Sequence, residues 1–310
     1  MELKKVGHSP HILHEDSTAG IMLDVIIALI PATLMGFVLF GPHAILLVLT
    51  TVAVAMISEF LCCKALKRPS SLKDLSAVVT GLLLGLNLPP QLPVWMAAIG
   101  AAVSIVVVKM MFGGIGQNFA NPAIVGRIVL MVSFAEAMTT WTQPFTWFTK
   151  VDAVSTATPL AATGSEPDYL QLLLGLHGGC IGETCAALLL LGGIYLCIRR
   201  VITPTIPLCF IGTVFLLSWA FGRDPVAAIL SGGLMLGAVF MATDYVTTPK
   251  GFLGQTIFGV GCGFFTVMIR LFANLPEGVS YSILLMNLLT PLIERITVRK
   301  PFGWEAHKNG

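Results

Sequence analysis

The chain has 310 residues, of which 55% are hydrophobic and only 11% are charged, and its formal net charge is +2. Because soluble domains usually carry about a quarter charged residues, this composition excludes an ordinary soluble domain. The near-neutral net charge gives no indication of nucleic-acid binding. Composition therefore predicts an all-α, polytopic membrane protein that is surrounded by the lipid bilayer.

Residues 1–20 are polar and charged, and they lack the apolar core and the small-residue cleavage site of a secretory signal peptide. We expect them to form a cytoplasmic N-terminal segment. His8, His11 and His14 follow at three-residue spacing, but a metal site would need a fourth ligand and a second shell of hydrogen bonds. An amphipathic surface segment is the favoured interpretation of these histidines.

Ten mainly apolar segments follow, and we expect each to form a transmembrane helix. Five belong to a first membrane repeat at 21–135 and five to a second at 181–294, with a connection at 136–180 between them and a cytoplasmic tail at 295–310. The expected helices are 22–41, 43–62, 76–90, 94–112, 121–135, 181–198, 205–221, 226–243, 252–270 and 279–294.

Basic residues predict the orientation of these helices, because cytoplasmic loops are enriched in Lys and Arg. The side that holds both termini would carry most of them, namely Lys4, Lys5, Lys64, Lys67, Arg68, Lys73, Arg199, Arg200, Lys250 and those of the tail. The opposite side would carry only Lys150, Arg223 and Arg270. Both termini are therefore expected in the cytoplasm, and the 136–180 connection outside.

Other polar side chains within or near the expected helices have plain interpretations. The charged ones are expected to snorkel to the membrane surface or to contact other subunits; they are Asp24, Glu59, Lys109, Arg127 and Arg270. The seven cysteines form no CxxC pair and are interpreted as small buried hydrophobic residues.

Two stretches, 77–90 and 227–249, share small residues, a glycine and a run into polar residues and proline. In the expected topology they cross the membrane in opposite directions, so the two halves would be inverted repeats. Helices broken near glycine and proline often build a central polar site in such proteins. Patterns of this kind are also common where helices simply pack closely.

Two polar segments on the cytoplasmic side offer candidate binding residues. In 112–127, Asn118 and Asn121 follow three glycines, and neutral amides can bind a carbonyl-rich heterocycle such as isoalloxazine without burying charge. A helix-breaking loop capped by Asn-Pro explains the same pattern. In 240–251, Asp244 and Thr243 could serve a cation or a polar ligand, and a hydroxyl-capped helix end explains them equally well.

The outer connection contains the hydroxyl-rich stretch "DAVSTATPL" at 152–160. From the residues alone, a Ser/Thr-rich turn with Pro159 at the start of a helix is favoured. Trp141 and Trp147 precede this stretch and are interpreted as anchors at the headgroup level, rather than as residues that stack on a cofactor.

Five collinear stretches together carry a resemblance that spans nearly the whole chain. They are "IMLDVIIALIPA", "GGIGQNFANPAIVGR", "DAVSTATPLA", "FMATDYVTTPKG" and "EGVSYSILLMNLLTPLIER". The chain resembles the family of the D subunit of the Rnf ion-translocating ferredoxin:NAD oxidoreductase complex and, more distantly, of the B subunit of the sodium-pumping NADH:quinone oxidoreductase. This family is similar in architecture to urea transporters, which agrees with two repeats of five helices.

The resemblance implies that FMN is attached covalently, through its phosphate, to Thr158. Ser155 and Ala157 would frame the attachment site, and Asp152 lies just before it. A flavin transferase that works outside the cytoplasm would make the bond. The resemblance also implies a non-covalent flavin, riboflavin, on the cytoplasmic side, with Asn118, Asn121 and Asp244 as candidates. No metal ligands and no catalytic residues are expected in this chain.

The expected function is that of a multi-pass subunit of a prokaryotic inner membrane, which passes electrons within a complex that couples ferredoxin–NAD redox to sodium or proton transport. The chain has no dinucleotide-binding or iron–sulfur motif. The partners that the resemblance implies therefore include a second subunit with covalent flavin, iron–sulfur subunits, an NAD-binding subunit and further membrane subunits. The alternative is a transporter or channel subunit for a small solute or ion.

Overall fold

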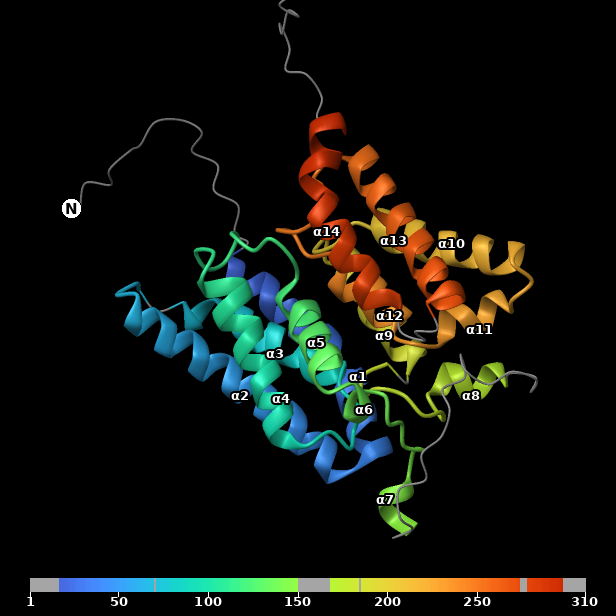
Figure 1. The fold of residues 1–310 in the computed structure, drawn as a ribbon, viewed down its shortest axis with the longest axis horizontal. Helices are drawn as coiled ribbons and strands as arrows, with labels where there is room; N and C mark the ends of the chain where they lie inside the picture. Colours follow the sequence, from blue (N-terminus) through green and yellow to red (C-terminus); the bar gives the residue numbers. More distant parts are fainter. Residues whose placement is uncertain (1–16, 70, 150–167, 184, 274–277, 298–310) are drawn as a thin grey trace, which may run out of the picture.

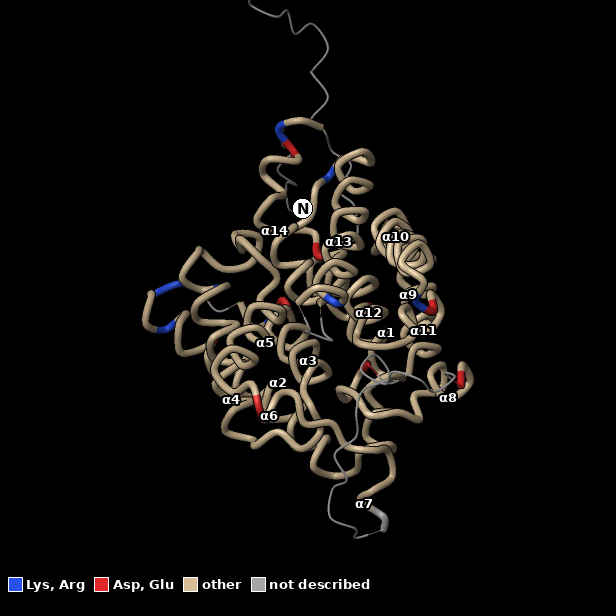
Figure 2. The backbone as a smooth tube through the Cα atoms, turned by 45° about the vertical axis from the view of Figure 1, so that its right-hand side comes forward, with Lys and Arg blue, Asp and Glu red and all other residues tan. Residues whose placement is uncertain are grey.

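A computed structural model describes residues 17–69, 71–149, 168–183, 185–273 and 278–297. The regular elements within these residues are helices, which confirms the all-α fold (Figure 1). Four of them are long and apolar enough to cross a membrane, and further apolar helices are shorter. Charged residues are sparse along the described chain, as Figure 2 shows, and this agrees with a polytopic membrane protein.

The first half follows the expected order of helices. Its elements are α1 (Thr18–Phe40), α2 (Pro42–Ala65), the short η1 (Leu72–Asp74), α3 (Ser76–Leu86), α4 (Val94–Val103), which continues as the π-helix η2 (Ser104–Met110), and α5 (Pro122–Ser133). At about 1.5 Å per residue, the 11 residues of α3 span about 16 Å, which is about half of a hydrocarbon core of about 30 Å. Short helices follow in the connection between the two halves: α6 (Ala135–Met138), α7 (Thr146–Thr149) and α8 (Tyr169–Leu174).

The second half also keeps the expected order, but its third expected helix is broken. Its elements are α9 (Ala186–Ile198), α10 (Thr205–Ala220), α11 (Pro225–Leu230), α12 (Leu234–Leu236), the π-helix η3 (Gly237–Met241), α13 (Phe252–Phe272) and α14 (Gly278–Thr297). The break lies at Gly232 and Gly233, both of which have a φ of +67°. Glycine adopts this conformation readily, whereas residues with side chains rarely do. The prediction of a single helix at 226–243 was therefore wrong, because the chain leaves the helical conformation at these two glycines.

Local chemistry explains where several helices begin. Ser17 caps α1 by accepting a hydrogen bond from the backbone of Gly20. Asn121 and Asp224 cap α5 and α11 in the same way, and each is followed by a proline at the first helical position. Proline is favoured there because the first N–H groups of a helix have no intrahelical acceptor.

The two halves lie side by side and contact each other (Figure 1). Helix α1 of the first half contacts α9 of the second, and α5 contacts α14. Gly192 allows the α1–α9 contact, because a Cβ atom at this position would lie 2.5 Å from the Ala28 carbonyl oxygen. The inverted relation between the halves and the domain boundaries around them stay predictions.

Candidate functional site

A cavity of about 110 Å³ lies between the two halves, and residues of both predicted polar segments line it. Its wall combines apolar side chains with hydroxyl, amide and charged groups. The lining residues are Ile21, Met22, Val25, Ser76, Val79, Thr80, Leu83, Lys109, Ile115, Asn118, Asn121, Pro122, Leu196, Val201, Ile202, Phe240, Thr243, Asp244, Tyr245 and Val246. One cavity therefore brings together Asp244 and the pair Asn118 and Asn121, which is distant from it in the sequence.

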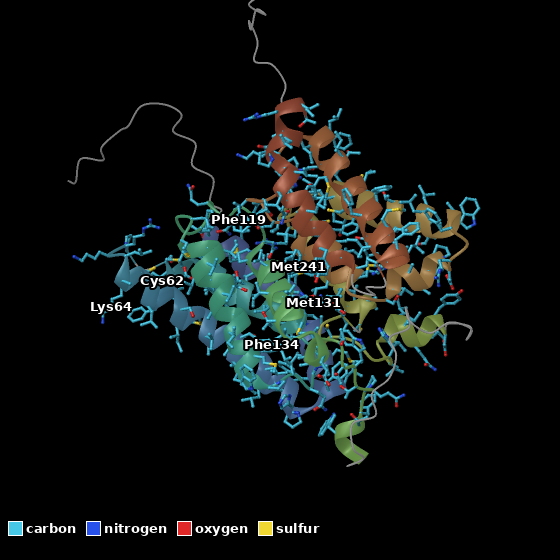
Figure 3. The ribbon with its side chains drawn as sticks, viewed as in Figure 1. Cys62, Lys64, Phe119, Met131, Phe134 and Met241 are labelled. Atoms are coloured by element: carbon cyan, nitrogen blue, oxygen red, sulfur yellow. The ribbon has the colours of Figure 1, made fainter. Side chains whose placement is uncertain are left out.

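The two asparagines differ in how they are engaged. Asn121 caps α5 through its side-chain oxygen, which accepts from the backbone N–H of Ala123 at 3.0 Å, and its amide nitrogen donates to the Met241 carbonyl at 3.2 Å. Figure 3 labels Met241, whose carbonyl accepts this hydrogen bond, and Phe119, which directly follows Asn118 in the sequence. The side-chain oxygen of Asn118 is buried and has no hydrogen-bond partner among the described residues. Asn118 is thus the amide that is available to a ligand.

Asn121 also belongs to a network that joins α5 to α14. With the Asn287 amide oriented to satisfy both neighbours, its oxygen accepts from the Asn121 backbone N–H at 3.1 Å and its nitrogen donates to the Thr247 carbonyl at 3.3 Å. The Thr290 hydroxyl donates to the same carbonyl at 2.8 Å. Asn121 therefore has a structural role in addition to its place in the cavity wall.

Asp244 has the structural role that the sequence allowed, and a role in binding a cation or a polar ligand stays a prediction. Its carboxylate accepts from the Val246 backbone N–H at 3.4 Å and from the Thr247 hydroxyl at 3.3 Å, so it shapes the turn after η3. It also lines the cavity, as does Thr243, whose hydroxyl donates to the Val239 carbonyl at 2.7 Å. Within the described part of the chain, no group of His, Cys, Asp and Glu is arranged to hold a metal ion.

The expectation that Lys109, Glu59 and Arg127 snorkel or contact other subunits was wrong. Lys109 donates to Glu59 at 2.8 Å, and their side chains are 2% and 0% exposed. Arg127 donates to Glu183 at 2.7 Å, and both side chains are 3% exposed. Both ion pairs are enclosed by the bundle. The signal that could have found them is the rule that an ionisable residue within the membrane faces the protein interior and a partner.

The Arg127–Glu183 pair lies where several broken elements meet. Arg127 in α5 also donates to the side-chain oxygen of Asn87, which caps the end of α3, at 2.5 Å, and to the Cys180 sulfur at 3.3 Å. Glu183 packs against Gly233, where a Cβ atom would lie 2.2 Å from its carboxylate oxygen. The ion pair therefore occupies the space between the end of α3 and the start of α12.

The proposed flavin attachment site, with Asp152, Ser155, Ala157 and Thr158, lies outside the described residues. The chain on both sides of it is tied to the bundle. Before it, Trp147 donates to the Val38 carbonyl at 3.3 Å, near the end of α1. After it, the Tyr169 hydroxyl donates to Asp224 at 2.7 Å, at the start of α11.

The fold and the enclosed polar side chains define a polytopic helical membrane protein built from two packed halves. A family model described as the NQR2, RnfD, RnfE family matches residues 5–303, and the chain belongs to this family. It is similar to the D subunit of a Na(+)-translocating ferredoxin:NAD(+) oxidoreductase complex of Acetobacterium woodii, with 46% identity over 96% of this chain and 95% of the relative.

Two further relatives cover similar lengths. The D subunit of a proton-translocating ferredoxin:NAD(+) oxidoreductase complex of Clostridium ljungdahlii is 44% identical over 96% of each chain. The D subunit of an ion-translocating oxidoreductase complex of Stutzerimonas stutzeri is 38% identical over 94% of this chain and 93% of the relative. The names of the first two relatives specify different ions at nearly equal identity, so similarity does not identify the ion for this chain.

Proposed function

We propose that this chain is the D subunit of an ion-translocating ferredoxin:NAD(+) oxidoreductase complex, in which it carries electrons across part of the membrane. The observation that carries the proposal is the similarity to proteins of that name over nearly the full length of both chains. The chain would act with the other subunits of the complex, which supply the nucleotide and iron–sulfur sites. The asymmetry of basic residues supports cytoplasmic termini and an outer connection at 136–180 in a prokaryotic inner membrane.

Thr158 is the proposed attachment site of a covalent FMN. Its hydroxyl can form a phosphoester, and Ser155 and Ala157 are small enough to leave it accessible to a flavin transferase. Trp147 and Tyr169, which precede and follow this stretch in the sequence, contact the end of α1 and the start of α11. When bound, FMN supplies one-electron chemistry, while the protein orients it and sets its potential.

The cavity is the proposed site of a non-covalent flavin, riboflavin. The buried oxygen of Asn118, which has no partner in the described part of the chain, can accept a hydrogen bond from a ring N–H. The apolar side chains of Phe240 and Leu83 can contact the ring faces. A cavity of about 150 Å³ holds a ligand of the size of benzene. A three-ring ligand therefore requires side chains to move. The loop that carries Asn118 contains three glycines at positive φ, Gly113, Gly114 and Gly116. Glycine has more backbone freedom than other residues, so we expect this loop to move when the ligand binds.

The transporter alternative has two supporting observations, the short α3 and the break between α11 and α12. Helices broken in this way line the substrate sites of many transporters. In this chain, however, Arg127, Glu183 and Asn87 fill the space beside the break with direct hydrogen bonds. We therefore favour the electron-transfer function.

A denaturing gel viewed under ultraviolet light tests the covalent flavin, and extraction of the purified complex tests the non-covalent one. With the flavin transferase co-expressed, we expect a fluorescent band in the wild type and in Thr156→Ala, and none in Thr158→Ala. We also expect one extractable riboflavin for each copy of this subunit. Absence of fluorescence from the wild type would exclude the covalent site.

A further inference from the structure

One member of a buried ion pair, Lys109, lies in the wall of the cavity, and neither proposed flavin site requires this pair. Lys109 and Ser76 both line the cavity. The Lys109 ammonium donates to the Glu59 carboxylate at 2.8 Å and to the Ser76 hydroxyl at 2.7 Å. Replacing a buried ion pair by apolar residues is often neutral or stabilising, so such a pair is weak evidence for a purely structural role.

Hydrogen bonds continue from this pair toward the protein surface. The Ser71 hydroxyl donates to the same Glu59 oxygen that Lys109 contacts. Ser71 is half-buried and lies in the connection between α2 and α3, close to the exposed Lys67 and Arg68. Lys109, Glu59 and Ser71 therefore form a continuous hydrogen-bonded chain from the cavity to the connection that the charge pattern assigns to the cytoplasm.

Two further features suit this hydrogen-bonded chain for proton transfer. The second carboxylate oxygen of Glu59 is buried and has no partner among the described residues, so it offers a free position for a proton. Lys109 lies in the π-helix η2, and π-helical segments occur frequently at functional sites. Other titratable groups nearby include Cys62 and Cys63 on α2, with the Cys63 sulfur 3.6 Å from the Ser71 hydroxyl, and Asp244 and Tyr245 in the cavity wall.

We propose that Ser71, Glu59 and Lys109 conduct protons between the cytoplasm and a redox ligand in the cavity. The proposal rests on the proposed function, which supplies both the ligand and the topology. Lys109 donates one proton to the ligand when a one-electron carrier of a neighbouring subunit reduces it. Water on the cytoplasmic side returns a proton to the Lys109 amine through Ser71 and Glu59. One electron and one proton thus reach the ligand together, and the ion pair regains its starting charges. Oxidation runs the same steps in reverse.

Two variants of the whole complex interrupt this chain at different points. Ser71→Ala removes the link to the surface and keeps the Lys109–Glu59 pair intact. A double variant, Glu59→Gln with Lys109→Met, removes both charges, so that neither is left buried without a partner. Asp24→Asn is the matched control. Asp24 pairs with Arg199 at 3.2 Å on the side of the membrane proposed to be cytoplasmic, and it does not belong to the hydrogen-bonded chain of Ser71, Glu59 and Lys109.

The measurements are the riboflavin content, the rate of its reduction between pH 6 and 9, and the accompanying proton uptake followed with a pH-sensitive dye. We expect wild-type flavin content in Ser71→Ala and Asp24→Asn, and because Lys109 lines the cavity, the rates of the double variant are compared per bound flavin. Reduction and proton uptake should slow together, severalfold in Ser71→Ala and about 100-fold in the double variant, the lower end of what a positioned acid or base contributes. Asp24→Asn should match the wild type.

The possible failures have different signatures. A wild-type complex without extractable riboflavin would overturn the inference together with the cavity site on which it rests. Retained flavin with unchanged rates of reduction and proton uptake in both variants would overturn the proton chain alone. A loss of sodium dependence in the variants, with proton uptake unchanged, would identify Glu59 as a cation ligand and would also contradict the proposal.

Discussion

The two buried ion pairs have the same chemistry but different surroundings. Arg127–Glu183 is buried and joins elements of both halves. Its neighbours are Asn87, Cys180 and Gly233. Lys109–Glu59 lies within the first half, borders a cavity and continues to a half-buried serine. The comparison teaches that burial alone does not define the role of an ion pair. We infer that the first pair holds the halves together and that the second exchanges protons.

Breaking the first pair should have the largest effect on stability. Arg127→Met leaves the Glu183 carboxylate buried without its cation, which is expected to lower the free energy of unfolding by about 3–5 kcal/mol. Thermal unfolding of the detergent-solubilised protein measures this loss. The double variant Arg127→Met with Glu183→Gln should recover more than half of it. A wild-type unfolding midpoint for the single variant would show that the pair does not hold the halves together.

Gly233 offers a second way to disturb the enclosed pair. Gly233→Ala places a methyl group 2.2 Å from the Glu183 carboxylate at a φ of +67°, so we expect a loss of about 1–3 kcal/mol through strain and a displaced carboxylate. Gly212→Ala is the control, because nothing lies within 4 Å of its Cβ position. Equal unfolding midpoints for the two variants would contradict the close packing of Glu183 on Gly233.

The cavity should separate binding from stability at its two asparagines. Asn118→Leu removes an oxygen that has no partner among the described residues, so riboflavin should be lost while the unfolding midpoint of the flavin-free protein stays unchanged. Asn121→Ala removes a helix cap and should lower stability by about 1 kcal/mol in addition. Flavin extraction and thermal unfolding measure both quantities. Undiminished riboflavin in Asn118→Leu would exclude this residue from the binding site.

A change in the connection at 136–180 should have the smallest effect on stability, and this effect should depend on pH. Burial raises the pKa of Asp224, but hydrogen bonds from Tyr169 and from the Ala227 and Val226 N–H groups outweigh it and hold the pKa below its ordinary value. The resulting stabilisation is present above the unfolded-state pKa and is lost as the pH falls through the lowered pKa.

Tyr169→Phe should therefore destabilise the protein by about 0.5–1.5 kcal/mol at pH 7, and by less as Asp224 becomes protonated. Unfolding midpoints measured from pH 7 downward compare this variant with the wild type. A difference that grows as the pH falls would contradict the role of Tyr169 in stabilising the ionised carboxylate.

The sequence predicted the helices well and their side-chain partners poorly. Apolar length and caps are local properties, so nine of the ten expected spans match described helices, and only the span at 226–243 is split, at Gly232 and Gly233. Glu59 and Lys109 are 50 residues apart, and their pairing depends on how a π-helix turns Lys109 inward. No local pattern contains that information.

The candidate site was predictable in its residue types but not in its division of labour. Glycine-flanked amides and a polar helix end indicated Asn118, Asn121 and Asp244, and all three line the cavity. The sequence indicated the Asn-Pro cap, but two facts follow only from the packing of the folded chain: Asn121 also contacts Met241, and the Asn118 oxygen has no partner among the described residues. Thr158 stays a prediction from the family motif.

The mass of the peptide that contains residues 155–160 tests the central claim most directly. We expect the peptide from the complex, matured with its flavin transferase, to carry the added mass of an FMN phosphoester, and fragmentation to assign it to Thr158 and not to Thr156. An unmodified peptide from a complex that transfers electrons at the normal rate would contradict the proposal that this protein carries electrons through a threonine-linked FMN.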